Sequence, residues 1–262
     1  MATAARIFWV GGRISYRGLF NWIRPSIYIP TMLGGPLFQI IFFTYLGRYA
    51  TSQPDSFFVV GNAIQVCAMS SVYGMAMAIA NERAFGTLGP LLASPANRAA
   101  VFLGRGVPVL ANGLVVSAFG FLVGALALGF RPSAGAVPAL ALTVVVTAAS
   151  CTAFGMLLGS IGLRAKDFMF AANLSYFLLL LFCGVNIPLD VLPGWMAAIG
   201  RALPLTHGIA AARELTAGAS LAEAGGLVAT EAGVAAAYAT AAYVLFRVLE
   251  WEGRRSAALD TL

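Results

Sequence analysis

Long apolar runs separated by short polar segments form the dominant pattern of this chain. Five windows carry no charge and have the length, about 20 residues, that a helix needs to cross about 30 Å of hydrocarbon. They are residues 25–47, 56–81, 106–130, 132–163 and 168–189. A sixth window, 224–246, contains a single acid, Glu231. The pattern predicts an all-α integral membrane protein with six transmembrane helices, approximately 27–47, 57–80, 106–130, 136–162, 168–187 and 225–247.

Composition agrees with a membrane protein and excludes an ordinary soluble domain. Of the 262 residues, 60% are hydrophobic and 10% charged, and the mean hydropathy is +0.86. A soluble domain carries roughly 25% charged residues. The net charge of +6 is scattered between the apolar runs and not clustered, so we expect no nucleic-acid partner and a single membrane domain over residues 1–262.

The distribution of basic residues predicts the orientation. With a cytoplasmic N-terminus, 12 of the 16 basic residues fall in inside segments, and an even number of spans places both termini in the cytoplasm. The twelve are Arg6, Arg13, Arg17, Arg24, Arg83, Arg98, Arg105, Arg164, Lys166, Arg247, Arg254 and Arg255.

The segment 5–23, before the first span, is interpreted as an amphipathic helix. Its arginines at 6, 13, 17 and 24 fall within roughly 40° of one another at 100° per residue. Phe8, Leu19, Trp22 and Ile23 lie on the other side, which favours a helix in the membrane interface. The alternative is a basic flank without helical structure.

Candidate chemistry is sparse. The only lysine, Lys166, follows no phosphate-binding glycine loop, so we expect no nucleotide site and no enzyme activity in this chain. Glu231 either faces a cavity or lies near the outer interface, and the sole histidine, His207, is a ligand or a surface residue. The three cysteines lack metal-ligand spacing, and no metal site is expected.

The cytoplasmic segment 81–98 has the features of a docking surface. Thr87 can cap a short helix that has Pro90 in its first turn and ends at Pro95. Leu88, Leu91 and Leu92 would form an exposed apolar turn. The alternative is a short helix that packs back onto the bundle.

This segment resembles the first cytoplasmic loop of ABC type-2 transporter permeases, which reads E-R-E-x-G-T-L-E-x-L-L-x-x-P. Two positions differ, since Ala84 and Gly89 stand where the family has acids. The matching residues are Glu82, Arg83, Gly86, Thr87, Leu88, Leu91, Leu92 and Pro95. The resemblance implies a coupling helix that docks on a separate ATPase subunit, which would hold ATP and Mg; no cofactor is expected in this chain.

A second stretch, 184–208, resembles the family's segment between the last two spans, where short re-entrant helices cap the pathway on the outer side. Prolines interrupt any continuous span here, and Trp195 suits an interface. The residues of this cap are Pro188, Pro193, Trp195 and Pro204.

The resemblance further implies a permease of the bacterial inner membrane that pairs with a second, identical or related, chain. Spans one, two and five would line the pathway, where candidate residues are Phe38, Phe42, Phe43, Tyr45, Tyr73, Met75, Tyr176, Phe177 and Phe182. Uncharged aromatic walls suit an amphipathic or apolar cargo such as a drug, antibiotic or lipid. The alternative for these residues is that they face lipid or pack between helices. The alternative cargo is a lipid-linked glycan. The alternative function is a membrane assembly or sensor subunit that transports nothing.

Overall fold

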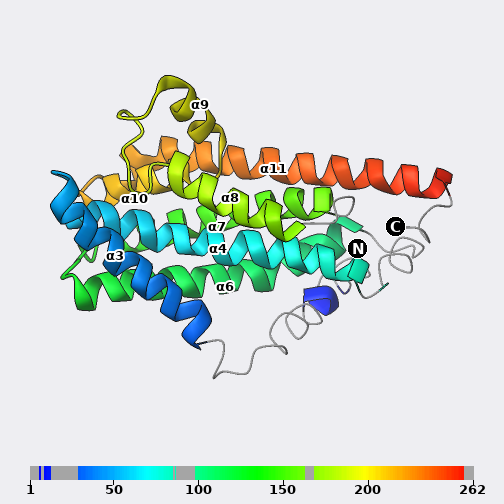
Figure 1. The fold of residues 1–262 in the computed structure, drawn as a ribbon, viewed down its shortest axis with the longest axis horizontal. Helices are drawn as coiled ribbons and strands as arrows, with labels where there is room; N and C mark the ends of the chain where they lie inside the picture. Colours follow the sequence, from blue (N-terminus) through cyan, green and yellow to red (C-terminus); the bar gives the residue numbers. More distant parts are fainter. Residues whose placement is uncertain are drawn as a thin grey trace.

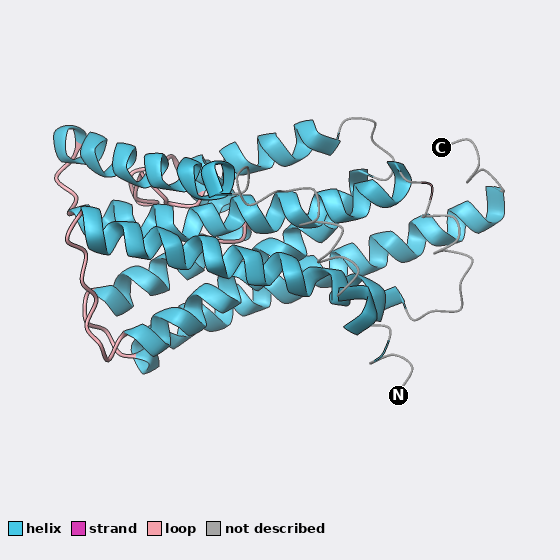
Figure 2. Cartoon of the chain, turned by 90° about the horizontal axis from the view of Figure 1, so that it is seen from below, coloured by secondary structure: helices cyan, strands magenta, loops and turns pink. Residues whose placement is uncertain are grey.

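The computed structural model describes residues 6, 9–12, 29–84, 86, 98–162 and 168–256. Within these ranges the chain forms helices and loops without a strand, and the long helices run side by side (Figures 1 and 2), as the all-α prediction expects. The elements are η1 (Ile29–Gly34), a π-helical turn, then α3 (Gly35–Ala50), α4 (Asp55–Ala84), α6 (Arg98–Ala127), α7 (Val137–Gly162), α8 (Phe168–Phe182), α9 (Gly194–Ala202), α10 (Thr206–Thr216) and α11 (Leu221–Ser256).

Four of the described helices, α4, α6, α7 and α11, are long and apolar enough to cross a membrane. The other two predicted spans are shorter. Helix α3 has 16 residues and extends the six-residue turn η1, whereas α8 has 15 residues. Helix α8 ends five residues before the predicted boundary at 187, and Gly184 with φ of +73° follows in the turn. The count of six spans therefore stays a prediction.

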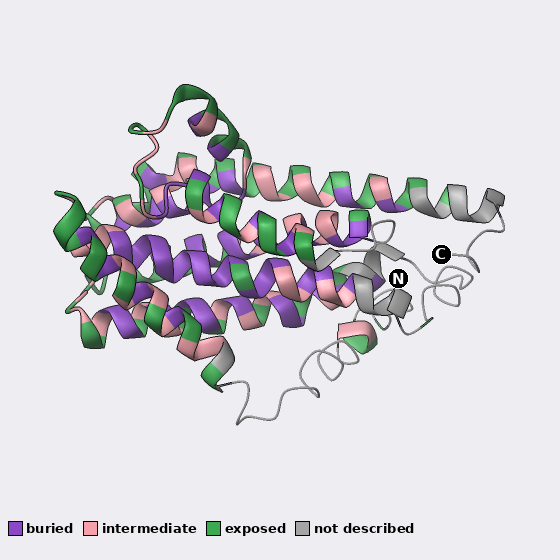
Figure 3. Cartoon of the chain, in the orientation of Figure 1, coloured by how far each residue is buried: buried purple, intermediate pink, exposed green. Residues whose placement is uncertain are grey.

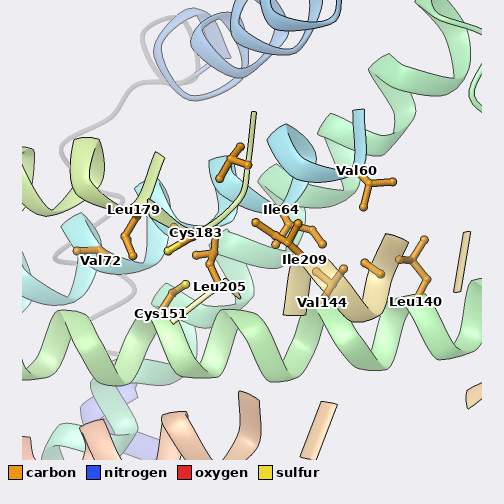
Figure 4. Packing of buried hydrophobic residues seen from close by; sticks show 13 residues of the cluster. Val60, Ile64, Val72, Leu140, Val144, Cys151, Leu179, Cys183, Leu205 and Ile209 are labelled. Carbon is orange, nitrogen blue, oxygen red and sulfur yellow. The ribbon is translucent and has the colours of Figure 1, made fainter. Parts of the chain in front are cut away.

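Helix α4 forms the centre of the bundle and is buried along most of its length (Figure 3). It packs against α3, α6, α7, α8 and α10. Small residues permit this close packing. A Cβ at Gly155 of α7, for example, would lie 2.9 Å from the carbonyl oxygen of Val72. A hydrophobic cluster that includes Ile64, Leu179 and Ile209 joins α4, α8 and α10 to α7 (Figure 4).

Helix α11 lies at the edge of the bundle, against α7 and α10, and reaches beyond the other helices (Figure 1). Only 11% of its apolar window is buried. At the N-terminus, the described residues 9–12 are helical. A Cβ at Gly12 would lie 3.0 Å from the carbonyl oxygen of Gly104, so this turn contacts the start of α6. Arg6 is also described, as helical and exposed, and the other residues of the predicted amphipathic helix 5–23 lie outside the described residues.

Candidate functional site

A chain of hydrogen-bonded, uncharged polar side chains connects α3, α4, α8 and the turn after α8. Gln39 Nε2 donates to Asn62 Oδ1 at 3.0 Å, and Asn62 Nδ2 donates to Asn186 Oδ1 at 2.7 Å. Tyr176 donates its hydroxyl proton to Gln39 Oε1 at 2.6 Å. We call Gln39, Asn62, Tyr176 and Asn186 the polar seam. Burying amides among apolar helices is costly unless they are paired, and here they pair with one another.

Gln65 extends the polar seam by one turn of α4. Its side chain is fully buried, and Nε2 donates to the backbone oxygen of Tyr176 at 3.4 Å. Its Oε1 has no hydrogen-bond partner among the described residues. A buried acceptor without a partner is uncommon in native proteins. It leaves one acceptor in this region for which the described part of the chain supplies no donor.

Aromatic side chains flank the polar seam. The rings of Tyr73 and Tyr176 lie 6.5 Å apart, those of Tyr176 and Phe177 5.7 Å apart, and the Tyr73 hydroxyl donates to Asn173. Phe177 of α8 is 61% exposed, and Phe38 of α3 is 72% exposed. The structure thus brings α3, α4 and α8 together, the helices that correspond to predicted spans one, two and five.

The other candidate pathway residues divide between the surface and the interior. Phe42 is exposed and packs edge-on against Phe43, and Tyr45 is exposed beneath the guanidinium of Arg48. Met75 and Phe182, in contrast, are buried within the single chain. In this conformation those two side chains contribute to the interior of the bundle and not to its surface.

Glu231 holds α11 against the start of α10. Its side chain is 1% exposed, and each carboxylate oxygen accepts a backbone hydrogen bond, from Leu205 N at 3.0 Å and from Gly208 N at 3.1 Å. The first N–H groups of a helix have no partner inside the helix, and its dipole favours a negative charge there. Glu231 thus caps α10 from another helix, which is a structural role.

The backbone at this cap is strained. Leu205 has a φ of +86°, a conformation that costs about 1–3 kcal/mol for a non-glycine residue. Gly208 meets α7 so closely that an added Cβ would be 2.0 Å from Thr147 Oγ1. The Thr206 hydroxyl donates to the carbonyl oxygen of Gly200. Several contacts therefore fix residues 204–208 in one unfavourable conformation.

Arg213 of α10 anchors the turn after α8. Its guanidinium donates to the carbonyl oxygens of Gly184 and Val185, both at 2.8 Å, and of Phe57 at 3.1 Å. Its Cζ lies 3.4 Å from the centre of the Phe57 ring, in cation–π geometry. Arg213 thus connects α10 to α4 and to the turn that carries Asn186 of the polar seam.

The predicted cap residues lie in or beside the two short helices α9 and α10. Pro193 precedes α9, Pro188 is in the preceding turn, and Pro204 is buried. Trp195 is exposed at 63%, and its ring lies 6.2 Å from that of Phe182. His207 Nε2 is 3.0 Å from the carbonyl oxygen of Arg201, so its contact is local to this segment. Two short helices between α8 and α11 agree with the sequence; whether they re-enter the membrane stays a prediction.

Most of the predicted coupling segment lies outside the described residues. Glu82 and Arg83 are in the last turn of α4, and Gly86 follows with a φ of +67°. The remaining residues of the predicted coupling segment lie outside the described residues: Thr87, Leu88, Leu91, Leu92 and Pro95. Their role stays a prediction.

Comparison with known proteins places the chain in a family. The model of the ABC-2 type transporter family matches residues 13–216, which include η1 and all the helices from α3 to α10. The chain belongs to the ABC-2 type transporter family. Members of this family are membrane subunits of transporters and not themselves catalytic enzymes, so this ABC-2 chain is a multi-pass membrane protein.

Among curated proteins, the chain is similar to the "Probable multidrug ABC transporter permease YbhR" of Escherichia coli K12 and of Escherichia coli O157:H7. In both cases 27% of 135 aligned residues are identical. The alignment covers 50% of this ABC-2 chain and 35% of each relative, so the chain matches about a third of the relatives' length.

Sequence reasoning missed the amides of the site. It selected aromatic residues because the predicted spans lacked charge. Yet Gln39, Asn62 and Gln65 were visible as amide side chains within the first two uncharged windows. A buried amide in a membrane helix needs a partner, and that requirement was a usable signal.

Proposed function

We propose that this chain is the permease subunit of an ATP-driven exporter and that the polar seam with its flanking aromatics lines the path of an amphipathic cargo. The observation that carries this proposal is a network of uncharged hydrogen-bonding side chains, in which Gln39 and Tyr176 are half-buried, beside exposed rings such as Phe177. Amides and hydroxyls bind neutral polar groups of a cargo, and rings bind its apolar part. Membership of the ABC-2 family and the multidrug name of the relative support export of such compounds.

The proposed mechanism uses two permease chains and two ATPase subunits. The exposed aromatic face of α3 and α8 would meet the second chain, identical or related, and the pathway would lie between them. ATP and Mg bound on the ATPase would drive alternating opening through the coupling segment 82–95, in the inner membrane with both termini cytoplasmic. The α9–α10 segment would close the outer end.

A lipid-linked glycan is the second candidate cargo. The polar seam is compatible with a glycan because amide side chains bind sugar hydroxyls and aromatic rings stack on sugar faces. Cargo-stimulated ATP hydrolysis by the reconstituted transporter separates the two candidates. Stimulation by an amphipathic dye such as rhodamine 6G supports drug export, and stimulation only by a polyprenyl-linked sugar supports glycan export. Assembly with an ATPase that no cargo stimulates would favour the non-transporting alternative.

Removing one seam hydrogen bond is expected to weaken cargo stimulation without loss of assembly. In Tyr176→Phe the ring remains but the donor to Gln39 is lost, and one neutral hydrogen bond is worth about 0.5–1.5 kcal/mol. The dye concentration for half-maximal stimulation of ATPase activity should therefore rise about two- to tenfold. Phe177→Ala should raise it as well, because an exposed ring is lost.

Leu126→Ala is the matched control, since Leu126 is 79% exposed on α6, a helix that contributes no side chain to the polar seam. It should leave the dye response unchanged. Equal dye responses in wild type, Tyr176→Phe and Phe177→Ala would contradict a pathway at the seam and leave these side chains with a packing role.

The proposed orientation is tested by labelling single cysteines with a membrane-impermeant maleimide. We expect Ser133→Cys to react from outside and Ser94→Cys and Ser256→Cys to react only after permeabilisation, because the basic residues flank the latter two. The three native cysteines are buried, which keeps the background low. Reaction of Ser94→Cys in intact cells would reverse the topology and remove the coupling proposal.

A further inference from the structure

A groove separate from the polar seam lies between α11 and the adjoining ends of α4, α6 and α7. It encloses about 280 Å³. Its lining includes Ile79, Leu103, Met156, Ala239, Tyr243 and Arg247. The groove stays open because α11 contributes the small side chains Ala239 and Ala242 to its wall. The volume is at the lower end of the range for drug-sized pockets, which suits a single slender chain better than a bulky cargo.

The depth of the groove matches the boundary between water and hydrocarbon. Charged residues bound the apolar stretches of α4, α6 and α11 at this level, since Glu82 is three residues beyond Ile79, Arg105 is two residues from Leu103, and Arg247 is itself charged. Ala239 is eight residues deeper in α11 than Arg247, or about 12 Å along the helix. The groove therefore runs from the membrane surface roughly two turns into the hydrocarbon.

Its chemistry changes along that direction. At the mouth, the exposed side chains of Arg247 and Tyr243 supply a guanidinium and a hydroxyl, the groups that bind phosphate and occupy the headgroup region. Deeper, the walls are mainly apolar, with Met156 and Ala239. The hydroxyls of Ser160 and Thr240 also line the groove, and each donates to a backbone oxygen of its own helix. A cation at the surface with an apolar slot below it matches a phospholipid, which has an anionic headgroup above an acyl chain.

We propose that this groove binds one anionic phospholipid, with its phosphate at Arg247 and one acyl chain between α11 and α7. The charge of this end favours an anionic over a zwitterionic lipid. Among the described residues 6, 9–12, 79–84, 86, 98–105 and 239–256, seven are basic and three acidic. Basic residues beside a membrane attract anionic headgroups, and basic pockets between membrane helices bind them specifically. The site is independent of the cargo pathway.

The test is native mass spectrometry of the purified full chain after incubation with equal amounts of phosphatidylglycerol and phosphatidylcholine. Wild type should retain one phosphatidylglycerol in preference to phosphatidylcholine. Arg247→Gln should lower that preference about fivefold, the contribution typical of one basic residue near a membrane surface. Ala239→Phe, which fills the slot, should lower retention of both lipids.

Two variants of identical chemistry serve as controls: Arg131→Gln at the opposite end, and Ala241→Phe on the exposed face of α11. Size-exclusion profiles and melting temperatures show that each variant is folded. The proposal fails if either groove variant retains lipid as wild type does, or if its matched control loses as much. No ATPase or cargo is present, so the result does not depend on whether the export function is correct.

Discussion

Replacing Glu231 by alanine is expected to release the α9–α10 segment from the bundle and to abolish transport. The substitution leaves the buried N–H groups of Leu205 and Gly208 without an acceptor, at about 1–3 kcal/mol each. It also leaves the strained φ of Leu205 without the hydrogen bond that helps to hold it. Both effects act on residues 204–208, which are then held only by other contacts, such as those of Thr206 and Arg213.

Cys183 is a direct reporter of that release. It is buried, and its thiol donates to the carbonyl oxygen of Pro204 at 3.3 Å, directly before the strained residue. In a background with Cys67 and Cys151 replaced by alanine, maleimide should modify Cys183 much faster in Glu231→Ala than in the parent. Glu231→Gln should give an intermediate rate, because its single amide oxygen can accept only one of the two bonds directly.

Glu214→Ala is the matched control, since Glu214 is an exposed acid on α10 itself. It should leave both Cys183 reactivity and transport unchanged. If Glu231→Ala protects Cys183 as well as the parent does and transports normally, the cap is dispensable, and the Arg213 and Thr206 contacts are sufficient to hold the segment.

The long helices could be predicted because they depend on local composition. Windows without charge and with sufficient length correspond to α4, α6 and α7, and prolines at 188, 193 and 204 indicated where no span continues. Helix α8 ends before the predicted limit of its span because the turn at Gly184 is stabilised from outside the segment, by Arg213. Nothing in the apolar run itself indicates that contact.

The function of Glu231 could not be predicted for the same reason. Its partners, Leu205 and Gly208, are 26 and 23 residues away in sequence, and the sequence left open whether the acid faces a cavity or lies near the outer membrane interface. The structure shows contacts that neither alternative specified, a cap on a neighbouring helix. The polar seam likewise pairs Gln39 with Tyr176, 137 residues apart, so the separate amides acquire meaning only in the folded chain.

The coupling segment is the place where a single substitution should separate folding from transport. The chain belongs to the ABC-2 type transporter family, and the export function that we propose requires an ATPase to act on it through a cytoplasmic contact. Leu88, Leu91 and Leu92 follow the end of α4 and match the family's coupling loop. Burial of one leucine at an interface is worth about 1.5–3 kcal/mol, or roughly ten- to a hundredfold in affinity.

Leu91→Asp should therefore reduce recovery of the ATPase in a pull-down by at least tenfold and abolish transport, because a charge in place of the leucine also has to be desolvated. The membrane bundle should still fold, since its core residues on α4, α7 and α8 are untouched. Asn97→Asp introduces the same charge six residues later and should bind the ATPase normally. Equal pull-down and transport by wild type and Leu91→Asp, at matched membrane expression, would show that the docking contact lies in another part of the chain.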